Sequence, residues 1–349
     1  MTDERVVFFD ATSHQAQKNS VNARKILFQF PGQGSQYPGM GSDLVEEFPV
    51  ARETYDRASA ILGYDLARLS FEDAEDQLGK TRFTQPALLT HQIACLYALK
   101  SLTGDAVEPY VAAGHSLGEY TALVAAEAIS LEAGLALVAE RGRLMSELGR
   151  GSMLATTLEL ADAQVLADKH FCGVGGCNLP EQTVIAGRDA DLETLQADLK
   201  ETYPGKRAVP LKTEGAFHTY LMVRAADEFR PVLERTDFES LRFEVLSNYT
   251  GKPHVDEPGA IRSRLFFQLF SPVRWITCMN WIVQAGVDTI IEFGGGIGKG
   301  TDPADKRPNL ESIAKKSLKW HEHEAQYLAA INVAGIRSAA ETLKTDRTA

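Results

Sequence analysis

The motif Gly-His-Ser-Leu-Gly at residues 114–118 constrains the fold of this chain more than any other stretch. It follows a mostly apolar run at 107–113 and precedes an alanine-rich, helix-forming segment at 120–129. A serine between two glycines at a sharp strand-to-helix turn is typical of a nucleophile elbow, because glycine has no Cβ to keep strand and helix apart. The motif therefore predicts that Ser116 occupies a strained turn facing a cleft. A glycine-rich turn with a capping serine is the bland alternative, and the helix-forming segment argues against it.

Composition narrows the classes of partner. The chain has 349 residues, enough for one large domain with a smaller one inserted. Its formal net charge is −11, so we expect no nucleic-acid partner, because duplex binding needs a basic surface. Its four cysteines show no paired metal-ligand spacing, which predicts free thiols and no metal site. With no secretory signal and no apolar run of about 18 residues, we expect a cytoplasmic protein without a membrane span.

Strands and helices alternate along most of the chain, which predicts an α/β fold. We expect the fold to begin at Lys25, with a strand at 26–30 that leads into a glycine-rich loop at 31–36. The other main elements that the pattern predicts are helices at 44–62 (interrupted at Pro49), 84–102 (entered through Pro86) and 131–148, and strands at 243–248 and 287–293.

The pattern of expected secondary structure changes between Met153 and Leu211. Short strands alternate with helices there, in the order strand, helix, strand, helix, strand. This order predicts a compact α+β insertion of ferredoxin-like type. The expected domains are a polar lead-in at 1–24, a catalytic domain at 25–152 and 213–335, the inserted subdomain at 153–212, and a C-terminal tail at 336–349.

Two glycine-rich loops invite a nucleotide-binding interpretation, which their spacing does not support. Neither the loop at 31–36 nor the run at 294–300 has the Gly-Lys-Ser/Thr of a P-loop, and a tight turn after a strand explains 294–300 better. The stretch that follows is basic within an acidic chain. We call its six cations the basic island: Lys299, Lys306, Arg307, Lys315, Lys316 and Lys319.

An activated serine needs a base within hydrogen-bond reach. Among eight histidines, His218 is the best choice by position, because it closes a Gly-Ala-Phe-His turn where the insertion returns to the main domain. His115 is expected to point away from its serine neighbour. His254 lies in a turn without any accompanying signature. Spacing alone does not decide among them.

Five motifs together resemble the malonyl-CoA:acyl-carrier-protein transacylases, a family that includes the acyltransferases of fatty-acid and polyketide synthesis. They are Phe-Pro-Gly-Gln-Gly-Ser-Gln at 30–36, Thr-Gln-Pro-Ala at 84–87, Gly-His-Ser-Leu-Gly-Glu-Tyr at 114–120, Arg-Gly-Arg-Leu-Met at 141–145 and Gly-Ala-Phe-His at 215–218. The match runs from about residue 25 to 331. It implies an α/β-hydrolase-like large domain with an inserted ferredoxin-like subdomain.

The resemblance also implies a role for each matching residue. Ser116 would be the nucleophile and His218 the base, with the backbone carbonyl of Gln268 orienting the histidine in place of an acid. Further implied roles are the oxyanion-hole amides of Gln33 and Leu117, the malonyl carboxylate partner Arg141, and the pocket residues Gln85 and Phe217.

The expected activity is transfer of malonyl from malonyl-CoA to an acyl carrier protein through a serine ester, with no bound cofactor or metal. Alternatives are an acyl hydrolase acting on carrier proteins, a transacylase for a substituted malonyl unit, and a carrier-docking scaffold with a vestigial site. The chain departs from the family where Gly-Gly-Gly at 294–296 replaces the usual Gly-Pro-Gly, and where residues 297–308 form a longer, more basic extension. We expect the basic island to help dock an acidic carrier.

Overall fold

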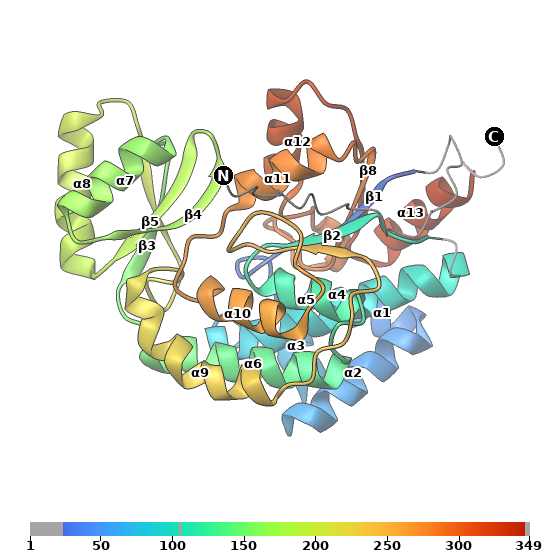
Figure 1. Cartoon of the computed structure of the whole chain (residues 1–349). Helices are drawn as coiled ribbons and strands as arrows, with labels where there is room; N and C mark the ends of the chain where they lie inside the picture. The colour runs from blue at the N-terminus through green and yellow to red at the C-terminus, as the bar shows by residue number, and fades with distance from the viewer. Residues whose placement is uncertain (1–23, 105–106, 346–349) are drawn as a thin grey trace, which may run out of the picture.

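A five-stranded parallel sheet forms the centre of the larger part of the computed structural model, which describes residues 24–104 and 107–345 (Figure 1). Its strands lie in the order β7-β2-β1-β8-β9. Their bounds are β1 (Ile26–Phe30), β2 (Val111–Gly114), β7 (Glu244–Leu246), β8 (Thr289–Phe293) and β9 (Gln326–Ala330). The strand expected at 26–30 is confirmed residue for residue.

Helices cover both faces of this sheet, which explains why its strands are continuous apolar runs. Along β1, Phe28 and Phe30 join the larger core, whereas Leu27 faces the opposite side and packs with Trp275. The helices on the larger-core side are α1 (Ser42–Glu47), α2 (Pro49–Leu62), α3 (Leu66–Phe71), α4 (Thr81–Thr103), α5 (Leu117–Ala125), α6 (Leu131–Leu148), α9 (Val223–Arg235), α10 (Pro258–Gln268) and α13 (Val333–Thr345). The opposite face carries α11 (Trp275–Gln284) and α12 (Glu311–Trp320).

A second, antiparallel sheet lies at the left of Figure 1. Its order is β4-β5-β3-β6, and two helices pack on it through a separate apolar core that includes Leu166, Ile185 and Leu195. The elements are β3 (Ser152–Thr156), α7 (Leu160–Lys169), β4 (Gly173–Leu179), β5 (Gln182–Gly187), α8 (Asp189–Thr202) and β6 (Ala208–Leu211). This βαββαβ arrangement is ferredoxin-like, so the fold class expected from the sequence is confirmed.

Strand β4 was absent from the sequence expectation, because Gly-Val-Gly-Gly lacks the β-branched pattern that marks a strand. Close packing explains these glycines: a Cβ on Gly175 would lie 2.9 Å from the Phe217 carbonyl oxygen. The strand therefore runs directly beside the turn that carries His218.

Two element boundaries differ from the expectation. Helix α4 begins at Thr81, so Pro86 lies inside the helix and does not open it. The tail expected from residue 336 is wrong as far as residue 345, because 336–345 belong to α13. This helix buries an apolar stripe that includes Ile336, Ala340 and Leu343. Most of the expected lead-in, residues 1–23, lies outside the described residues.

The chain bends at Gly294 directly after β8, and Ile297 then forms an isolated bridge with Arg307, so the tight turn expected over 294–300 is limited to this bend. Gly294 and Gly295 both have φ of +67°, and a Cβ on Gly295 would lie 2.6 Å from the Ser35 hydroxyl. Among the described helices, none combines the length and the apolar character that crossing a membrane requires.

Candidate active site

The turn between β2 and α5 has the geometry of a nucleophile elbow. Ser116 adopts φ of 53° and ψ of −101°, a conformation that is strained for a residue with a Cβ. Its glycine neighbours are sterically required: a Cβ on Gly114 would lie 1.8 Å from the Gly118 carbonyl carbon, and one on Gly118 would lie 2.2 Å from the Phe30 carbonyl oxygen. The strand and the helix therefore pass as closely as the motif predicts.

His218 lies within hydrogen-bond reach of the serine. The Ser116 Oγ is 2.7 Å from His218 Nε2, and His218 Nδ1 is 2.8 Å from the backbone carbonyl oxygen of Gln268. Since a carbonyl oxygen can only accept, Nδ1 carries the proton and Nε2 presents a lone pair to the serine hydroxyl. The backbone carbonyl thus holds the imidazole in the tautomer that a base requires, the role that an aspartate plays in a triad.

The electrostatic surroundings keep His218 neutral. The side chain is buried, and burial together with the nearby Arg141 cation lowers the His218 pKa from 6.5 to about 3. A histidine in this state accepts a proton from serine over the whole neutral and weakly acidic range.

The depressed pKa predicts an unusual pH profile for acylation of Ser116, the reaction that the family resemblance implies. The active form of His218 is neutral and is lost only as the pH falls through its pKa of about 3. We therefore expect kcat/KM for loading to stay flat from pH 8 down to about pH 5, well below the ordinary histidine midpoint of about 6.5. Quenched-flow loading rates check this, and an acid limb centred near pH 6.5 would contradict it.

Arg141 reaches the nucleophile from α6. Its side chain is buried; Nη2 donates to Ser116 Oγ at 3.1 Å and to Gln268 Oε1 at 3.1 Å, and Nη1 donates to Gln85 Oε1 at 2.8 Å. The Nε atom has no hydrogen-bond partner, and the guanidinium lies 5.2 Å from the ring centroid of Tyr120. Among the described residues, no carboxylate lies within ion-pair distance of it. This arrangement leaves a buried cation beside the serine with only neutral acceptors.

The two residues expected to supply oxyanion-hole amides lie on either side of the elbow. Leu117 is the first residue of α5, where backbone amides lack intrahelical acceptors. Gln33 lies in the loop after β1, which is held in place by Gln33 Nε2 donating to Thr81 Oγ1 at 3.1 Å. A Cβ on Gly32 would lie 2.5 Å from the His115 carbonyl oxygen, so this loop rests directly against the elbow.

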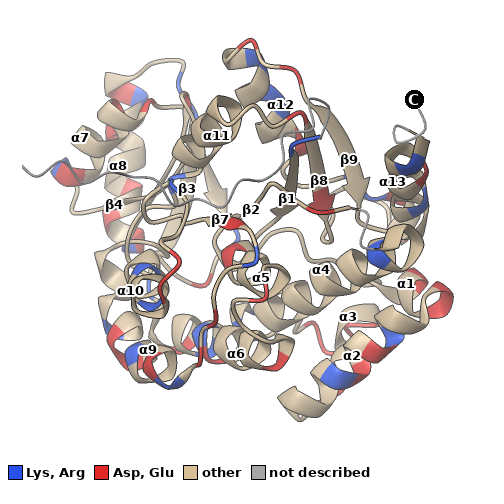
Figure 2. Cartoon of the chain, turned by 45° about the vertical axis from the view of Figure 1, so that its right-hand side comes forward, with Lys and Arg blue, Asp and Glu red and all other residues tan. Residues whose placement is uncertain are grey.

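The remaining expected site residues are the two pocket residues, Gln85 and Phe217, and the six cations of the basic island. Phe217 is buried and its ring lies against Gly149 and Gly215, while Gln85 contacts Arg141 directly. Of the basic island, four members line one groove of about 430 Å³ along α12 and the preceding loop: Arg307, Lys315, Lys316 and Lys319. Figure 2 shows basic segments along α12.

The other two members of the basic island, Lys299 and Lys306, are not among the residues that line this groove. Lys306 donates to the backbone carbonyls of Gly298 and Gly300 and lies over the Tyr37 ring, so it stabilises its own loop. Lys299 is exposed on that loop. The structure therefore brings four of the six cations together on one surface.

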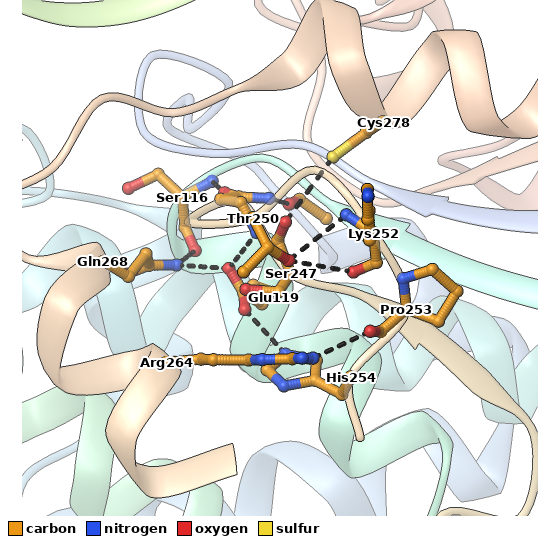
Figure 3. Close-up of polar contacts among 12 residues, drawn as sticks. Ser116, Glu119, Ser247, Thr250, Lys252, Pro253, His254, Arg264, Gln268 and Cys278 are labelled. Atoms are coloured by element: carbon orange, nitrogen blue, oxygen red, sulfur yellow. Dashed lines mark hydrogen bonds and ion pairs between the residues drawn. The ribbon is translucent and has the colours of Figure 1, made fainter. Parts of the chain in front are cut away.

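Three residues that the sequence analysis passed over lie beneath the elbow. Asn248 Oδ1 accepts from the Ser116 backbone amide at 2.6 Å, and Glu119 accepts from the Asn248 backbone amide. Glu119 also accepts from Gln268 Nε2 (Figure 3). His254 contacts Glu119 at 2.8 Å. The position of Asn248 could have been predicted from the strand order. Because β7 pairs in parallel with β2, the residues that follow the two strands meet at one edge of the sheet. Glu119 belongs to the motif at 114–120 but received no role from the resemblance, and His254 lies in a turn without an accompanying signature.

No set of three or more histidine, cysteine, aspartate or glutamate side chains within 24–104 and 107–345 is arranged to hold a metal ion. The four cysteines are buried and unpaired with one another. The side chains that meet at the elbow are Ser116, His218 and Arg141.

Comparison with known proteins agrees with this geometry. The model of the acyl transferase domain matches residues 27–264, more than half of the chain. The malonyl CoA-acyl carrier protein transacylase of Bacillus subtilis is 38% identical over 281 residues, which cover 78% of this chain and 87% of that protein. The polyketide biosynthesis malonyl CoA-acyl carrier protein transacylase PksC of the same organism is 38% identical over 276 residues, covering 78% and 93%.

The fold of this chain also agrees with that of a solved relative. The malonyl-transacylase solved with its type II PKS acyl-carrier protein superposes with a TM-score of 0.82 at 33% identity, covering 91% of this chain and 99% of that one. Sequence and structure thus lead to the same assignment: the chain belongs to the acyl transferase domain family, as the five motifs indicated.

Proposed function

We propose that this acyltransferase moves a malonyl group from malonyl-CoA to the phosphopantetheine thiol of an acyl carrier protein, through an ester on Ser116. The observation that carries the proposal is Arg141, a buried cation that donates to the Ser116 hydroxyl and contacts no carboxylate among the described residues. The names of the similar proteins support the same donor and acceptor.

In the first half-reaction, Ser116 Oγ attacks the thioester carbonyl while its proton passes to His218 Nε2. The amides of Gln33 and Leu117 would stabilise the oxyanion of the tetrahedral intermediate. When the carbon–sulfur bond breaks, the His218 imidazolium returns the proton to the departing CoA thiolate. Malonyl then remains as an ester on Ser116.

The second half-reaction is the reverse sequence with a different thiol. His218 Nε2 takes the proton of the phosphopantetheine thiol, and the thiolate attacks the malonyl ester carbonyl. Collapse of the intermediate breaks the bond to Ser116 Oγ, which regains its proton from His218. The carrier leaves as a malonyl thioester, and the enzyme returns to its starting state.

Arg141 supplies selectivity for the acyl group. Its planar guanidinium can grip both oxygens of a carboxylate that takes no part in bond making. A malonyl group satisfies this cation, whereas an acetyl group leaves it desolvated and without a carboxylate in direct contact, a difference of about 3 to 5 kcal/mol in a buried site. Burial lowers the Arg141 pKa, which reflects the cost of keeping the cation there unpaired.

Arg141→Ala is therefore expected to lower malonyl loading by about two to three orders of magnitude, while loading of acetyl holds or rises. The assay mixes equimolar malonyl-CoA and acetyl-CoA with the enzyme and reads both adducts by intact-protein mass spectrometry. Arg143→Ala is the matched control on the same helix, because Arg143 is partly exposed and pairs with Glu140 and Glu147.

If Arg141→Ala keeps the wild-type preference for malonyl, Arg141 does not bind the carboxylate and the substrate assignment loses its main support. Equal losses in Arg141→Ala and Arg143→Ala would point to a damaged helix α6 instead of a lost contact.

The groove of the basic island is the surface proposed for carrier docking. We expect the double charge reversal of Lys315 and Lys316 to raise KM for the carrier about tenfold and to flatten its salt dependence, without changing loading from CoA. Reversal of Lys100 and Lys344, on α4 and α13, is the control with the same change in net charge. Steady-state transfer rates at several salt concentrations check this, and equal effects of both double variants would refute specific docking.

We also propose a cytoplasmic location. Four buried cysteines in the free thiol state support it, because such thiols persist in a reducing compartment.

A further inference from the structure

A buried carboxylate lies directly beneath the reacting groups and takes no part in the chemistry described above. Glu119 is in the first turn of α5, three residues after the nucleophile, and it is fully buried. Its Oε2 accepts from the backbone amide of Asn248 at 2.9 Å. The same oxygen accepts from Gln268 Nε2 at 2.8 Å, and Oε1 accepts from His254 Nε2 at 2.8 Å (Figure 3). Three donors from three separate segments thus converge on one side chain.

The first segment, the end of α10, reaches both the base and the arginine. The Gln268 backbone carbonyl holds His218, and its side-chain Oε1 accepts from Arg141. Its Nε2 donates to Glu119 and to the Ser116 carbonyl oxygen. A flipped Gln268 amide would turn Oε1 towards the Glu119 carboxylate and the Ser116 carbonyl oxygen, and its NH₂ group towards Arg141. Three repulsive contacts would then replace three hydrogen bonds.

The second segment, the turn after β7, clamps the elbow itself. The Asn248 side chain accepts from the Ser116 amide at 2.6 Å and donates to the Gly114 carbonyl oxygen at 2.8 Å. These bonds span the strained turn on both sides of His115. Because Glu119 accepts from the Asn248 backbone amide, the same carboxylate fixes this clamp as well.

The third segment supplies His254, whose side chain is fully buried. Its Nδ1 has no hydrogen-bond partner in the described structure, so Glu119 is the only hydrogen-bond partner that the ring has there. A buried polar side chain with a single partner gains little for stability by itself. The His254 Nε2–H bonds Oε1 of Glu119. This contact orients the carboxylate so that Oε2 faces Asn248 and Gln268.

We propose that Glu119, oriented by His254, is a positioning residue that fixes Gln268 and Asn248, and through them the His218 base, Arg141 and the Ser116 elbow. The positioning role of Glu119 depends on the proposed malonyl transfer only for the identity of the acyl group. Positioning of the serine and the histidine is independent of that identity.

The test uses variants of His254, which is three hydrogen bonds away from the His218 ring, through Glu119 and Gln268. The amide nitrogen of a glutamine takes about the place of His Nε2, whereas that of an asparagine takes about the place of Nδ1 and cannot reach Glu119. His254→Asn and His254→Leu should lower the loading rate constant at saturating malonyl-CoA about 10- to 100-fold, with KM changed less than about threefold. His254→Gln should stay within about threefold of wild type in both constants.

Two controls separate positioning from stability. His91→Leu removes another fully buried histidine, one that contacts Cys95 and none of the residues above, so it should lower the melting temperature without selectively slowing loading. Combining His254→Asn with Glu119→Gln should slow loading little more than Glu119→Gln alone, since His254 acts through Glu119.

A second readout keeps this test apart from the proposed function. The rate at which a fluorophosphonate labels Ser116 depends on the serine and its base and on no acyl-CoA, and it should fall in parallel with loading. If wild type fails to load malonyl, the proposed function fails while the labelling rates still test the positioning role. The positioning role is overturned if His254→Asn and His254→Gln are slowed alike, or if His254→Asn is slowed no more than His91→Leu.

Discussion

Ser116→Ala is expected to abolish acyl loading, with a loss on the order of 10⁶ in kcat. The motif offers no substitute nucleophile: Ser116 Oγ is the hydroxyl placed 2.7 Å from the base, at the tip of a turn built by Gly114 and Gly118. Intact-protein mass spectrometry after incubation with malonyl-CoA measures the loss. Ser101→Ala serves as a control, because this serine bonds only its own helix at the end of α4.

The substitution should leave the fold intact, since it removes only a hydroxyl group and no apolar core contact changes. A Ser116→Ala protein that still gains the mass of an acyl group would show that the ester forms elsewhere. The elbow would then be a structural turn, the alternative considered from the sequence.

His218→Ala is expected to slow loading by on the order of 10⁴ to 10⁶, because the Ser116 hydroxyl then has no base within reach. Burst kinetics with malonyl-CoA measure the effect. His115→Asn is the informative comparison: His115 neighbours the nucleophile in sequence, yet its Nε2 contacts Asn178 at 3.0 Å, away from Ser116.

His115→Asn should therefore slow loading far less than His218→Ala. Similar losses for the two variants, or near-wild-type loading by His218→Ala, would mean that the base has been misassigned.

The elements that the sequence predicts well are those with a local physical cause. The elbow follows from two glycines whose Cβ atoms would overlap the backbone, and β1 follows from an apolar run that packs on both faces of the sheet. Helix α6 is bounded by a capping serine, Ser130, and by Gly149, and it matches the expected 131–148 residue for residue.

The elements that the sequence does not predict depend on tertiary contacts. Strand β4 is formed by a glycine-rich segment whose register is set by its neighbours, and α13 looked like a tail because its apolar stripe has meaning only against α4. Glu119 lies in the motif at 114–120 without an assigned role, because an acidic side chain in the first turn of a helix is common. Its burial becomes visible only when Asn248, His254 and Gln268 converge on it.

The site residues divide in the same way. Ser116 could be selected from its local motif, and His218 was only the best choice by position. The base role of His218 and the roles of Gln268 and Arg141 came from the family resemblance. In the structure, Gln268 contacts His218 through its backbone and Arg141 through its side chain, a double role that spacing cannot reveal.

The central claim is that Ser116 selects malonyl and passes it to a thiol. The most direct test mixes wild-type protein with equimolar malonyl-CoA and acetyl-CoA, records the intact mass, and then divides the sample between buffer and a phosphopantetheinylated acyl carrier protein. We predict a single malonyl adduct that persists in buffer and moves to the carrier. An acetyl adduct of equal abundance, or a malonyl adduct that is lost as quickly in buffer as with the carrier, would contradict the account.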